Sequence, residues 1–408
     1  MNTQVQERPS EKAGQTLKVI DVDTHWTEPA DLWTSRAPAK WKDRVPRMIP
    51  DADGVPTWTI DGDISLGLSS ASSVVHETGR KAIGYEFTKW NVDDVHPGCS
   101  QAGPRIEVMD RQGIWAQILY PNVLGFGGQG RMRRDGENAV PTIDADLRLM
   151  ATQIYNDAGA EMQESTGGRL LPQALLPWWD IKEAVKEAER CVDMGMTGIN
   201  INSDPHLNGM TDLSDDYWSP LWELCSDKGL PVNFHIGSSD SSNSWFGKSP
   251  WPSFDAGQKL AMGSAMMFIA NSQVIGNIII SGLLERFPKL KFVSVESGVG
   301  WLPFLLEALE YQIAESGAGI DGRYSMTPLE YFRRNIFACF WFEHEDFAYV
   351  ARKLGIDNVM FESDFPHPTC LYPDPLESAH RSLAGFSDEE KAKVLSANAA
   401  RCYNLDLS

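Results

Sequence analysis

The stretch Lys18-Val19-Ile20-Asp21-Val22-Asp23-Thr24-His25 (residues 18–25) starts as an apolar run and ends in carboxylate and imidazole side chains. Successive side chains of a strand point to opposite faces, so Asp21, Asp23 and His25 are expected on one face. Polar and charged groups on the inner face of a sheet are costly unless they are paired. A bound ion would supply a partner there; a hydrogen-bonded polar cluster, or a cap for the following segment, is the alternative.

The same pattern, a short apolar run followed by polar or glycine-rich residues, recurs along the chain. It predicts strands at residues 18–22, 116–119, 173–176, 198–201, 231–234, 291–295, 336–340 and 359–361. An apolar stripe at helical spacing predicts helices at residues 144–163, 181–194, 216–227, 301–315, 346–354 and 389–403. Glycines 195, 229 and 355 stand where helix C-caps belong.

This alternation of strands and helices indicates the α/β class, with parallel strands joined by crossover helices. Eight repeats of it predict a (β/α)8 TIM barrel, in which functional residues lie at the C-terminal ends of the strands. An open doubly wound sheet is the alternative, although no Gly-x-Gly-x-x-Gly motif follows the first run. Residues 40–104 are irregular in period and rich in Asp, Gly, Pro and Ser, and residues 26–104 are expected as a long insertion after the first strand that caps the site.

Composition limits the classes of protein. The chain has 408 residues and a net charge of −20, which disfavours a nucleic-acid binder. Six scattered cysteines without a Cys-x-x-Cys pair, and a polar start without an apolar signal, indicate a cytoplasmic protein with reduced thiols. Residues 1–17 are expected as a disordered or extended arm, and residues 18–408 as one domain. The charge-free stretch 260–284 is interpreted as a buried helix or helix pair and not as a membrane span.

Three further strands end in residues with side chains that bind metals. His235 closes the run 231–234, Glu296 follows the run 291–295, and Asp364 follows the run 359–361. In a closed barrel, Asp23, His25, His235 and Asp364 would converge at one mouth and offer two nitrogens and two carboxylates. That set suits a single divalent ion with an open position for water: Zn²⁺ is expected first, with Fe²⁺ or Mn²⁺ as alternatives. No lysine ends the run 198–201 that could be carboxylated to bridge a second ion.

At these residues the chain resembles the amidohydrolase superfamily, in the branch typified by aminocarboxymuconate-semialdehyde decarboxylase and the resorcylate decarboxylases. The similar segments span nearly the whole chain: residues 19–29, 105–122, 230–238, 282–307, 358–368 and 398–405. The resemblance implies a metal-dependent enzyme on a (β/α)8 barrel, with ligands at Asp23, His25, His235 and Asp364. It also implies a small-molecule substrate and a homodimer or larger homo-oligomer.

Two departures from the branch affect the chemistry. The usual His-x-His of the first strand is here Asp23-x-His25, and the histidine that commonly ends the sixth strand is replaced by Glu296. Either Glu296 takes over the task of activating water or moving protons, or the chemistry differs. His206 and His367 are the candidate replacement imidazoles.

The preferred hypothesis is a mononuclear metal-dependent hydrolase. Asp364 would accept a proton from metal-activated water and deliver it to the leaving group, with Glu296 orienting the water. The bond cleaved would be an amide, ester, thioester or vinylogous C–C bond.

The alternative is non-oxidative decarboxylation of an aromatic or unsaturated acid, with Asp364 protonating carbon. The branch favours this alternative, whereas the missing histidine and the lack of an arginine at a strand end disfavour it. A binding protein that has lost its metal is a third possibility.

Aromatic side chains at or just after the predicted strand ends indicate an apolar or aromatic-walled pocket for a small molecule. The residues predicted to contact substrate are Trp26, Tyr120, Trp178, Phe340 and Trp341. Each of them would serve equally well as core filler, and that alternative stays open.

Overall fold

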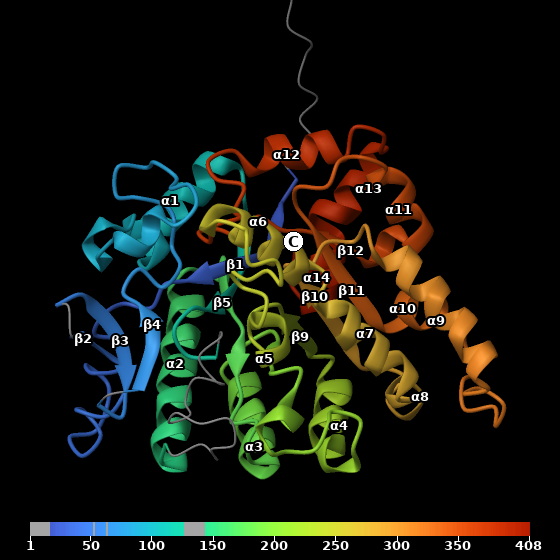
Figure 1. Cartoon of the computed structure of the whole chain (residues 1–408), viewed down its shortest axis with the longest axis horizontal. Helices are drawn as coiled ribbons and strands as arrows, with labels where there is room; N and C mark the ends of the chain where they lie inside the picture. Colours follow the sequence, from blue (N-terminus) through green and yellow to red (C-terminus); the bar gives the residue numbers. More distant parts are fainter. Residues whose placement is uncertain (1–16, 52–53, 63, 126–142) are drawn as a thin grey trace, which may run out of the picture.

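The computed structural model describes residues 17–51, 54–62, 64–125 and 143–408. Residues 1–16 of the arm predicted at 1–17 lie outside this range. The parallel strands gather in the centre of the molecule and helices surround them, whereas a separate antiparallel sheet lies at the left edge in Figure 1.

Every strand predicted from the sequence is present. The parallel strands are β1 (Ile20–Trp26), β5 (Ala116–Pro121), β6 (Leu170–Pro172), β7 (Ala174–Leu175), β8 (Ile199–Asn200), β9 (Pro231–His235), β10 (Lys291–Val295), β11 (Ile336–Phe340) and β12 (Val359–Phe361). They form two sheets, ordered β1-β5-β6 and β12-β11-β10-β9-β8-β7. Only Gln173 separates β6 from β7 in the sequence. The α/β class with parallel strands is therefore confirmed.

Backbone hydrogen bonds also connect β1 to the segment that follows β12. The amide of Asp364 donates to the carbonyl of Asp23 over 2.9 Å, and the amide of His25 donates to the carbonyl of Phe365 over 2.7 Å. These bonds fix the polar ends of the first and last parallel strands side by side.

Apart from β6 and β7, consecutive parallel strands are connected through helices, as the alternation predicted. The helices are α1 (Ala102–Gln112), α2 (Ala145–Ser165), α3 (Ile181–Asp193), α4 (Ser219–Lys228), α5 (Asp240–Asn243), α6 (Ala256–Phe268), α7 (Asn271–Ile280), α8 (Leu283–Arg286), α9 (Leu302–Ser316), α10 (Pro328–Asn335), α11 (Phe347–Leu354), α12 (Pro375–Ser382), α13 (Asp388–Ala392) and α14 (Asn398–Tyr403). A π-helical turn, Lys393–Ala397, joins the last two. Asp180 caps α3 by accepting bonds from the amides of Lys182 and Glu183. Gly229 ends α4 at φ 65°, a conformation that costs glycine little.

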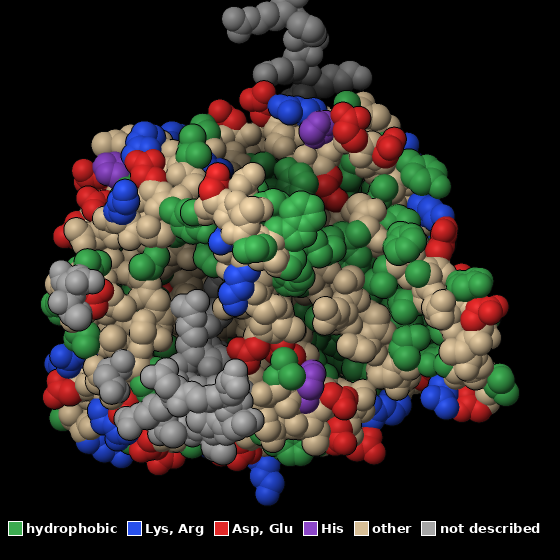
Figure 2. Space-filling view, in the orientation of Figure 1, with side chains coloured by type: hydrophobic (Ala, Val, Ile, Leu, Met, Phe, Trp, Pro, Cys, Tyr) green, Lys and Arg blue, Asp and Glu red, His purple; other side chains and the backbone are tan. Residues whose placement is uncertain are grey.

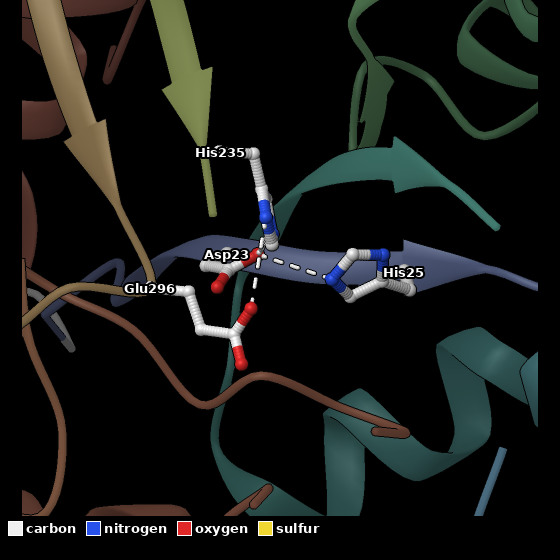
Figure 3. A group of neighbouring side chains, drawn as sticks. All are labelled: Asp23, His25, His235 and Glu296. Atoms are coloured by element: carbon white, nitrogen blue, oxygen red, sulfur yellow. Dashed lines mark hydrogen bonds and ion pairs between the residues drawn. The ribbon is translucent and has the colours of Figure 1, made fainter. Parts of the chain in front are cut away.

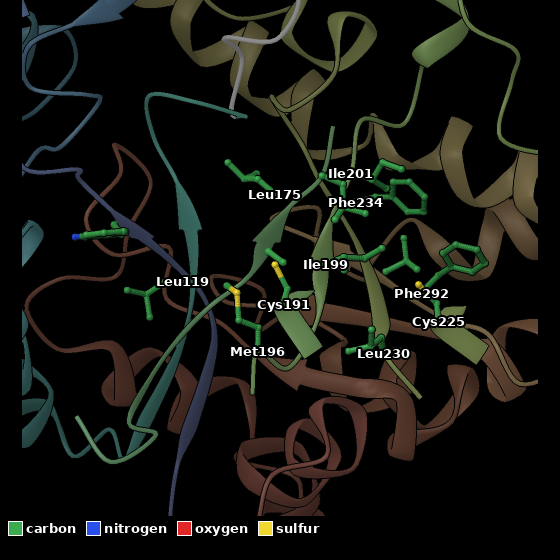
Figure 4. Close-up of a cluster of buried hydrophobic side chains, with 14 of the residues drawn as sticks. Leu119, Leu175, Cys191, Met196, Ile199, Ile201, Cys225, Leu230, Phe234 and Phe292 are labelled. Carbon is green, nitrogen blue, oxygen red and sulfur yellow. The ribbon is translucent and has the colours of Figure 1, made fainter. Parts of the chain in front are cut away.

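The main core lies between the strands and the surrounding helices. Phe234 of β9 and Phe292 of β10 stack there with ring centroids 5.5 Å apart (Figure 4). Truncating such a buried phenylalanine to alanine costs about 3–5 kcal/mol of stability. A second cluster joins side chains of β1, β5, β10, β11 and β12 to Tyr403 of the C-terminal helix α14.

Residues 26–104 contain a separate antiparallel sheet, ordered β2-β3-β4. Its strands are β2 (Arg47–Pro50), β3 (Pro56–Ile60) and β4 (Ile64–Leu68). Trp58 of β3 packs edge to face on Trp33, with ring centroids 5.6 Å apart, and the indole N–H of Trp33 donates to the carbonyl of Ala151 on α2. The antiparallel sheet is thereby anchored to the helix layer.

The charge-free stretch 260–284 forms a helix pair, as predicted, with α6 and α7 separated at residues 269–270. The stretch Ala256–Ile280 is long and apolar enough to cross a membrane by length and composition only. Its predicted burial is correct for α7, which buries Ile275, Ile278 and Ile279, but wrong for α6, whose one buried residue is Gly263. Hydrophobic side chains gather over the centre of the face in Figure 2, where Figure 1 places α6. The helix is half-exposed because it covers a cavity instead of the core.

Candidate metal centre

Five of the predicted site residues converge at the carboxyl ends of the parallel strands. Asp23 and His25 lie on β1, His235 ends β9, Glu296 follows β10, and Asp364 follows β12. All five are buried. Figure 3 shows four of them, with Asp23, His235 and Glu296 directed toward one another and His25 beside them.

The distances within this group are short. Asp23 Oδ1 lies 3.1 Å from His235 Nε2 and 3.7 Å from His25 Nε2. Asp364 Oδ1 lies 3.6 Å from the same nitrogen of His25. Two overlapping sets of side chains bring one ligand atom each within 4.8 Å of the others: Asp23, His25, His235 and Glu296, and His25, Glu296, Asp364 and His367. His367, predicted only as a replacement imidazole, therefore belongs to the centre.

Asp21 does not belong to these sets, although strict alternation put it on the face of Asp23. The register of β1 against β5 shifts between Asp21 and Thr24. The carboxylate of Asp21 instead accepts bonds from the amide of Ser363 over 2.8 Å and from its hydroxyl over 2.5 Å. The predicted shared face is correct for Asp23 and His25, whereas Asp21 ties β1 to the end of β12.

Each imidazole of the centre is oriented by a carbonyl oxygen behind it. His25 Nδ1 lies 3.2 Å from the backbone carbonyl oxygen of Pro121. His235 Nδ1 lies 2.6 Å from the backbone carbonyl oxygen of the next residue, Ile236. His367 Nε2 lies 2.6 Å from the side-chain oxygen Oδ1 of Asn122. A carbonyl oxygen only accepts, so the ring nitrogen that faces it carries the hydrogen. The other nitrogen of each ring then presents its lone pair to the centre, as in metal-binding histidines.

Burial favours the neutral, metal-binding form of two of these imidazoles, His25 and His367. Desolvation, with the neighbouring imidazoles, holds the pKa of His25 well below its usual value. The pKa of His367 is lowered in the same way by burial and by His235. Neutral rings are the ligand form, because protonation would block the lone pair.

The carboxylates show the opposite shift. Burial, then the charge of Asp23, raises the pKa of Asp364 well above its usual range, and burial with Asp364 nearby does the same for Glu296. Among the residues that the structure describes, none donates a hydrogen bond to Asp23 Oδ2 or to Asp364 Oδ1. A buried carboxylate oxygen without a donor costs several kcal/mol unless a cation lies beside it. The residues present therefore fit a divalent cation.

Two residues of the centre occupy a strained backbone conformation. Glu296 has φ 53° and Asp364 has φ 58°. These values lie in the left-handed region, which residues other than glycine rarely adopt. The hydroxyl of Thr369 donates to Asp364 Oδ2 and lies 3.4 Å from Glu296 Oε1. Strain of this kind is held by surrounding structure and is concentrated at functional sites.

The sequence pattern of the amidohydrolase family matches residues 20–405. The chain belongs to the amidohydrolase family. The resemblance recognised in the sequence is thereby confirmed.

This amidohydrolase has curated relatives that are decarboxylases. It is 23% identical to the gamma-resorcylate decarboxylase of Rhizobium sp. over 312 residues, which cover 74% of this chain and 86% of that relative. An amidohydrolase structure from Mycobacterium avium subsp. paratuberculosis matches with a TM-score of 0.73 at 21% identity, covering 97% of this chain and 100% of that one.

One structural relative of the amidohydrolase was determined with a metal. The 5-carboxyvanillate decarboxylase of Novosphingobium aromaticivorans, complexed with manganese and 4-hydroxy-3-methoxy-5-nitrobenzoic acid, matches with a TM-score of 0.57 at 20% identity. The match covers 75% of this chain and 81% of that one. This likeness shows that the amidohydrolase and the manganese-containing relative share a fold.

A cavity of about 690 Å³ opens beside the metal centre of the amidohydrolase. Glu296, His367 and Thr369 contribute to its wall from the centre. The antiparallel sheet of residues 26–104 contributes Trp58 and Leu66 among others, and α6 forms another side. The centre is therefore accessible to a small molecule from a mostly apolar space.

The structure places the remaining predicted residues elsewhere. His206 lies exposed in a 3-10 turn, outside both ligand sets and outside the cavity wall, so the structure does not bring it to the centre. None of the aromatic residues predicted to contact substrate forms part of that wall: Trp26, Tyr120, Trp178, Phe340 and Trp341 are buried in the core or beneath the histidines. Tyr120, for example, packs on His235 with ring centroids 4.8 Å apart.

The aromatic residues that do line the cavity were not predicted as site residues. They are Trp58, Phe87, Phe246 and Phe268. Phe246 follows β9 in a loop whose aromatic clustering indicated a pocket, so that signal was present in the sequence. The other three come from the insertion and from α6, whose position over the centre no local pattern reveals.

Proposed function

We propose that this amidohydrolase is a divalent-metal-dependent, non-oxidative decarboxylase of an aromatic or unsaturated carboxylic acid. The observation that carries the proposal is the buried cluster of three imidazoles and several carboxylates, which opens into an otherwise uncharged, largely apolar cavity. The decarboxylases among its relatives support this reaction over the hydrolysis preferred from sequence.

The proposal includes the fold on which the centre is built. We treat the parallel strands as one closed (β/α)8 barrel, with residues 26–104 as an insertion that caps its mouth. The bonds between Asp364 and Asp23 and between His25 and Phe365 support closure. The contribution of β3 and β4 to the cavity wall supports the capping role.

The proposed ligands of the ion are Asp23, His25, His235 and Asp364. When bound, the ion would polarise the substrate's oxygens and stabilise the negative charge that develops on them. The mixture of imidazole and carboxylate donors suits zinc, manganese or iron, and zinc is the first ion to test.

The residues around the ligands determine where the proton goes. Thr369 donates to Asp364 Oδ2, so Asp364 Oδ1 is the oxygen directed toward the centre. In the proposed reaction the bond between the ring carbon and the carboxylate breaks, and CO₂ leaves. The electron pair stays on carbon and takes up the proton carried by the Asp364 carboxyl. His367, whose Nδ1 lies 3.5 Å from Asp364 Oδ1, keeps that carboxyl in position.

The test separates the reaction classes directly. Protein loaded in turn with Zn²⁺, Mn²⁺ and Fe²⁺ is incubated with aryl carboxylic acids and, separately, with their esters, amides and thioesters. CO₂ release from an acid, abolished in Asp364→Asn, is the expected result. Acid release from an ester, amide or thioester without any CO₂ would overturn the proposal.

Hydrolysis is the second candidate because Glu296 gives the centre a further carboxylate. It lines the cavity, and its Oε2 lies 3.6 Å from His235 Nδ1. A carboxylate placed between a metal site and the substrate space is suited to orient an attacking water. A protein that retained no metal and catalysed neither reaction would instead be a binding protein.

A further inference from the structure

The cavity extends far beyond the metal centre. Its volume of about 690 Å³ is several times the roughly 150 Å³ that accommodates a benzene molecule in a protein interior. A substrate with a single ring would therefore fill only a small part of it and leave the rest to water.

Helix α6 gives the long dimension of this space. Its last residue, Phe268, accepts a hydrogen bond from the hydroxyl of Ser297, which neighbours Glu296 of the centre. Leu260 and Ala261, two turns earlier, also line the cavity. At a rise of 1.5 Å per residue, the wall formed by α6 extends roughly 12 Å along the helix from the end that contacts Ser297.

The chemistry of the wall changes along this direction. Among the described residues that line the cavity, Glu296 and His367 are the ones that ionise, and both belong to the metal centre. The rest of the wall consists mainly of aromatic and aliphatic side chains, with serine and threonine hydroxyls and the amide of Asn243 among them. A charged group at that end of a ligand would be desolvated without a partner, whereas apolar surface buried there is stabilised.

We propose that the substrate is an extended acid with a single acid group, which lies at the metal centre. The rest of the molecule is an uncharged apolar body that lies along α6 and is as long as two or three fused rings. The inference rests on the proposed function for the placement of the acid group. It goes further in excluding single-ring acids as the preferred substrates and in excluding a second charged group at the far end.

A series of acids that differ in ring number tests the shape of the substrate. The metal-loaded protein is titrated calorimetrically with 2-hydroxybenzoate, 1-hydroxy-2-naphthoate and a three-ring hydroxyphenanthrene carboxylate, and CO₂ release is followed in parallel. Kd is expected to fall at least tenfold from one ring to three, because each added ring buries apolar area. Equal or weaker binding of the larger acids would overturn the inference.

A substitution at the far end localises the effect. Ala261→Trp fills the space beside Leu260 and is expected to raise the ratio of the three-ring Kd to the one-ring Kd at least tenfold. Met262→Trp is the matched control, because Met262 lies next to Ala261, is 38% exposed and is not part of the cavity wall. An unchanged ratio in Ala261→Trp, or an equal change in the control, would overturn the inference.

Failure of the inference and failure of the proposed function have different signatures. If binding tightens with ring number but no acid releases CO₂, the reaction class is wrong and the substrate shape stands. If CO₂ is released fastest from the one-ring acid and the larger acids bind no tighter, the reaction class stands and the inference fails.

Discussion

The imidazole rings of His25 and His367 stack with centroids 3.5 Å apart and planes inclined by 16°, although the residues come from opposite ends of the chain. Two imidazolium ions would repel each other at this distance, and burial disfavours the charged form of both. The pair is therefore a neutral unit in which His25 faces Asp23 and Asp364, while His367 reaches the cavity.

Asn122 fixes the orientation of the His367 ring in this pair, because its Oδ1 accepts a hydrogen bond from His367 Nε2 over 2.6 Å. In Asn122→Leu the ring loses that partner and is free to present the wrong nitrogen. We expect kcat/KM to fall about 10- to 100-fold, the usual effect of removing the partner of a site histidine. Metal content should not change, and Asn122→Asp, which keeps the acceptor, should restore most of the activity. Loss of metal in Asn122→Leu would show that His367 is itself a ligand.

Replacement of His235 tests whether this residue binds the metal, and replacement of a histidine outside the centre serves as the control. In His235→Ala the centre loses a nitrogen that lies 3.1 Å from Asp23 Oδ1. We expect the purified variant to bind metal at least ~10-fold more weakly, as measured by elemental analysis after dialysis. His206→Ala removes an exposed imidazole outside the ligand sets and should retain the full metal content. Equal metal content in the two variants would contradict the proposed ligands.

Glu296→Gln discriminates between the two candidate reactions. Glutamine keeps the shape of the side chain and removes its ability to accept a proton. Decarboxylation needs no activated water, so CO₂ release should stay within about tenfold of the wild-type rate, whereas loss of a general base costs roughly 10²–10⁴-fold. Metal content serves as the control, since Glu296 is not among the proposed ligands. A loss of CO₂ release of a hundredfold or more with the metal retained would contradict this expectation and would mean that Glu296 transfers a proton in the reaction.

The sequence was sufficient to find the parallel strands other than β6 and to propose the ligands, because both are local patterns, but it missed β6 and the antiparallel strands β2, β3 and β4. An apolar run that ends in Asp-x-His or in Glu-Ser-Asp identifies a strand and its functional end together. The cavity wall is a tertiary property: Trp58 reaches it only because β3 packs on Trp33, and Phe268 only because α6 lies across the centre. Trp178 and Phe340 carry the same local signal as a pocket residue, but the surrounding helices bury them.

The strained backbone of Glu296 predicts an inversion of the usual order of alanine and glycine. At φ 53° the alanine side chain is disfavoured, so Glu296→Gly should be more stable to denaturant than Glu296→Ala by about 1–2 kcal/mol. Lys186, exposed in the middle of α3, provides the control. There the alanine variant should be more stable to denaturant than the glycine variant by about 1 kcal/mol. The same order at both positions would mean that Glu296 is not held in the left-handed region in solution.

The buried carboxyl of Glu28 predicts how stability depends on pH. It accepts hydrogen bonds from the amides of Asn122 and Val123, and burial raises its pKa from 4.5 to about 7. Between these values the folded state binds more protons than the unfolded state, so this carboxyl lowers stability as pH rises from 4.5 to 7, and its effect is complete above that range.

Glu28→Gln removes this titration and keeps an oxygen acceptor for both amides. Its stability relative to wild type should therefore increase between pH 5 and pH 8, by at most about 3 kcal/mol for a shift of this size. Denaturant unfolding at the two pH values measures the difference. Glu189→Gln, at an exposed position of α3, should show no comparable change. A difference between wild type and Glu28→Gln that stays constant from pH 5 to pH 8 would mean that Glu28 remains ionised throughout, with its two amide bonds offsetting the cost of burial.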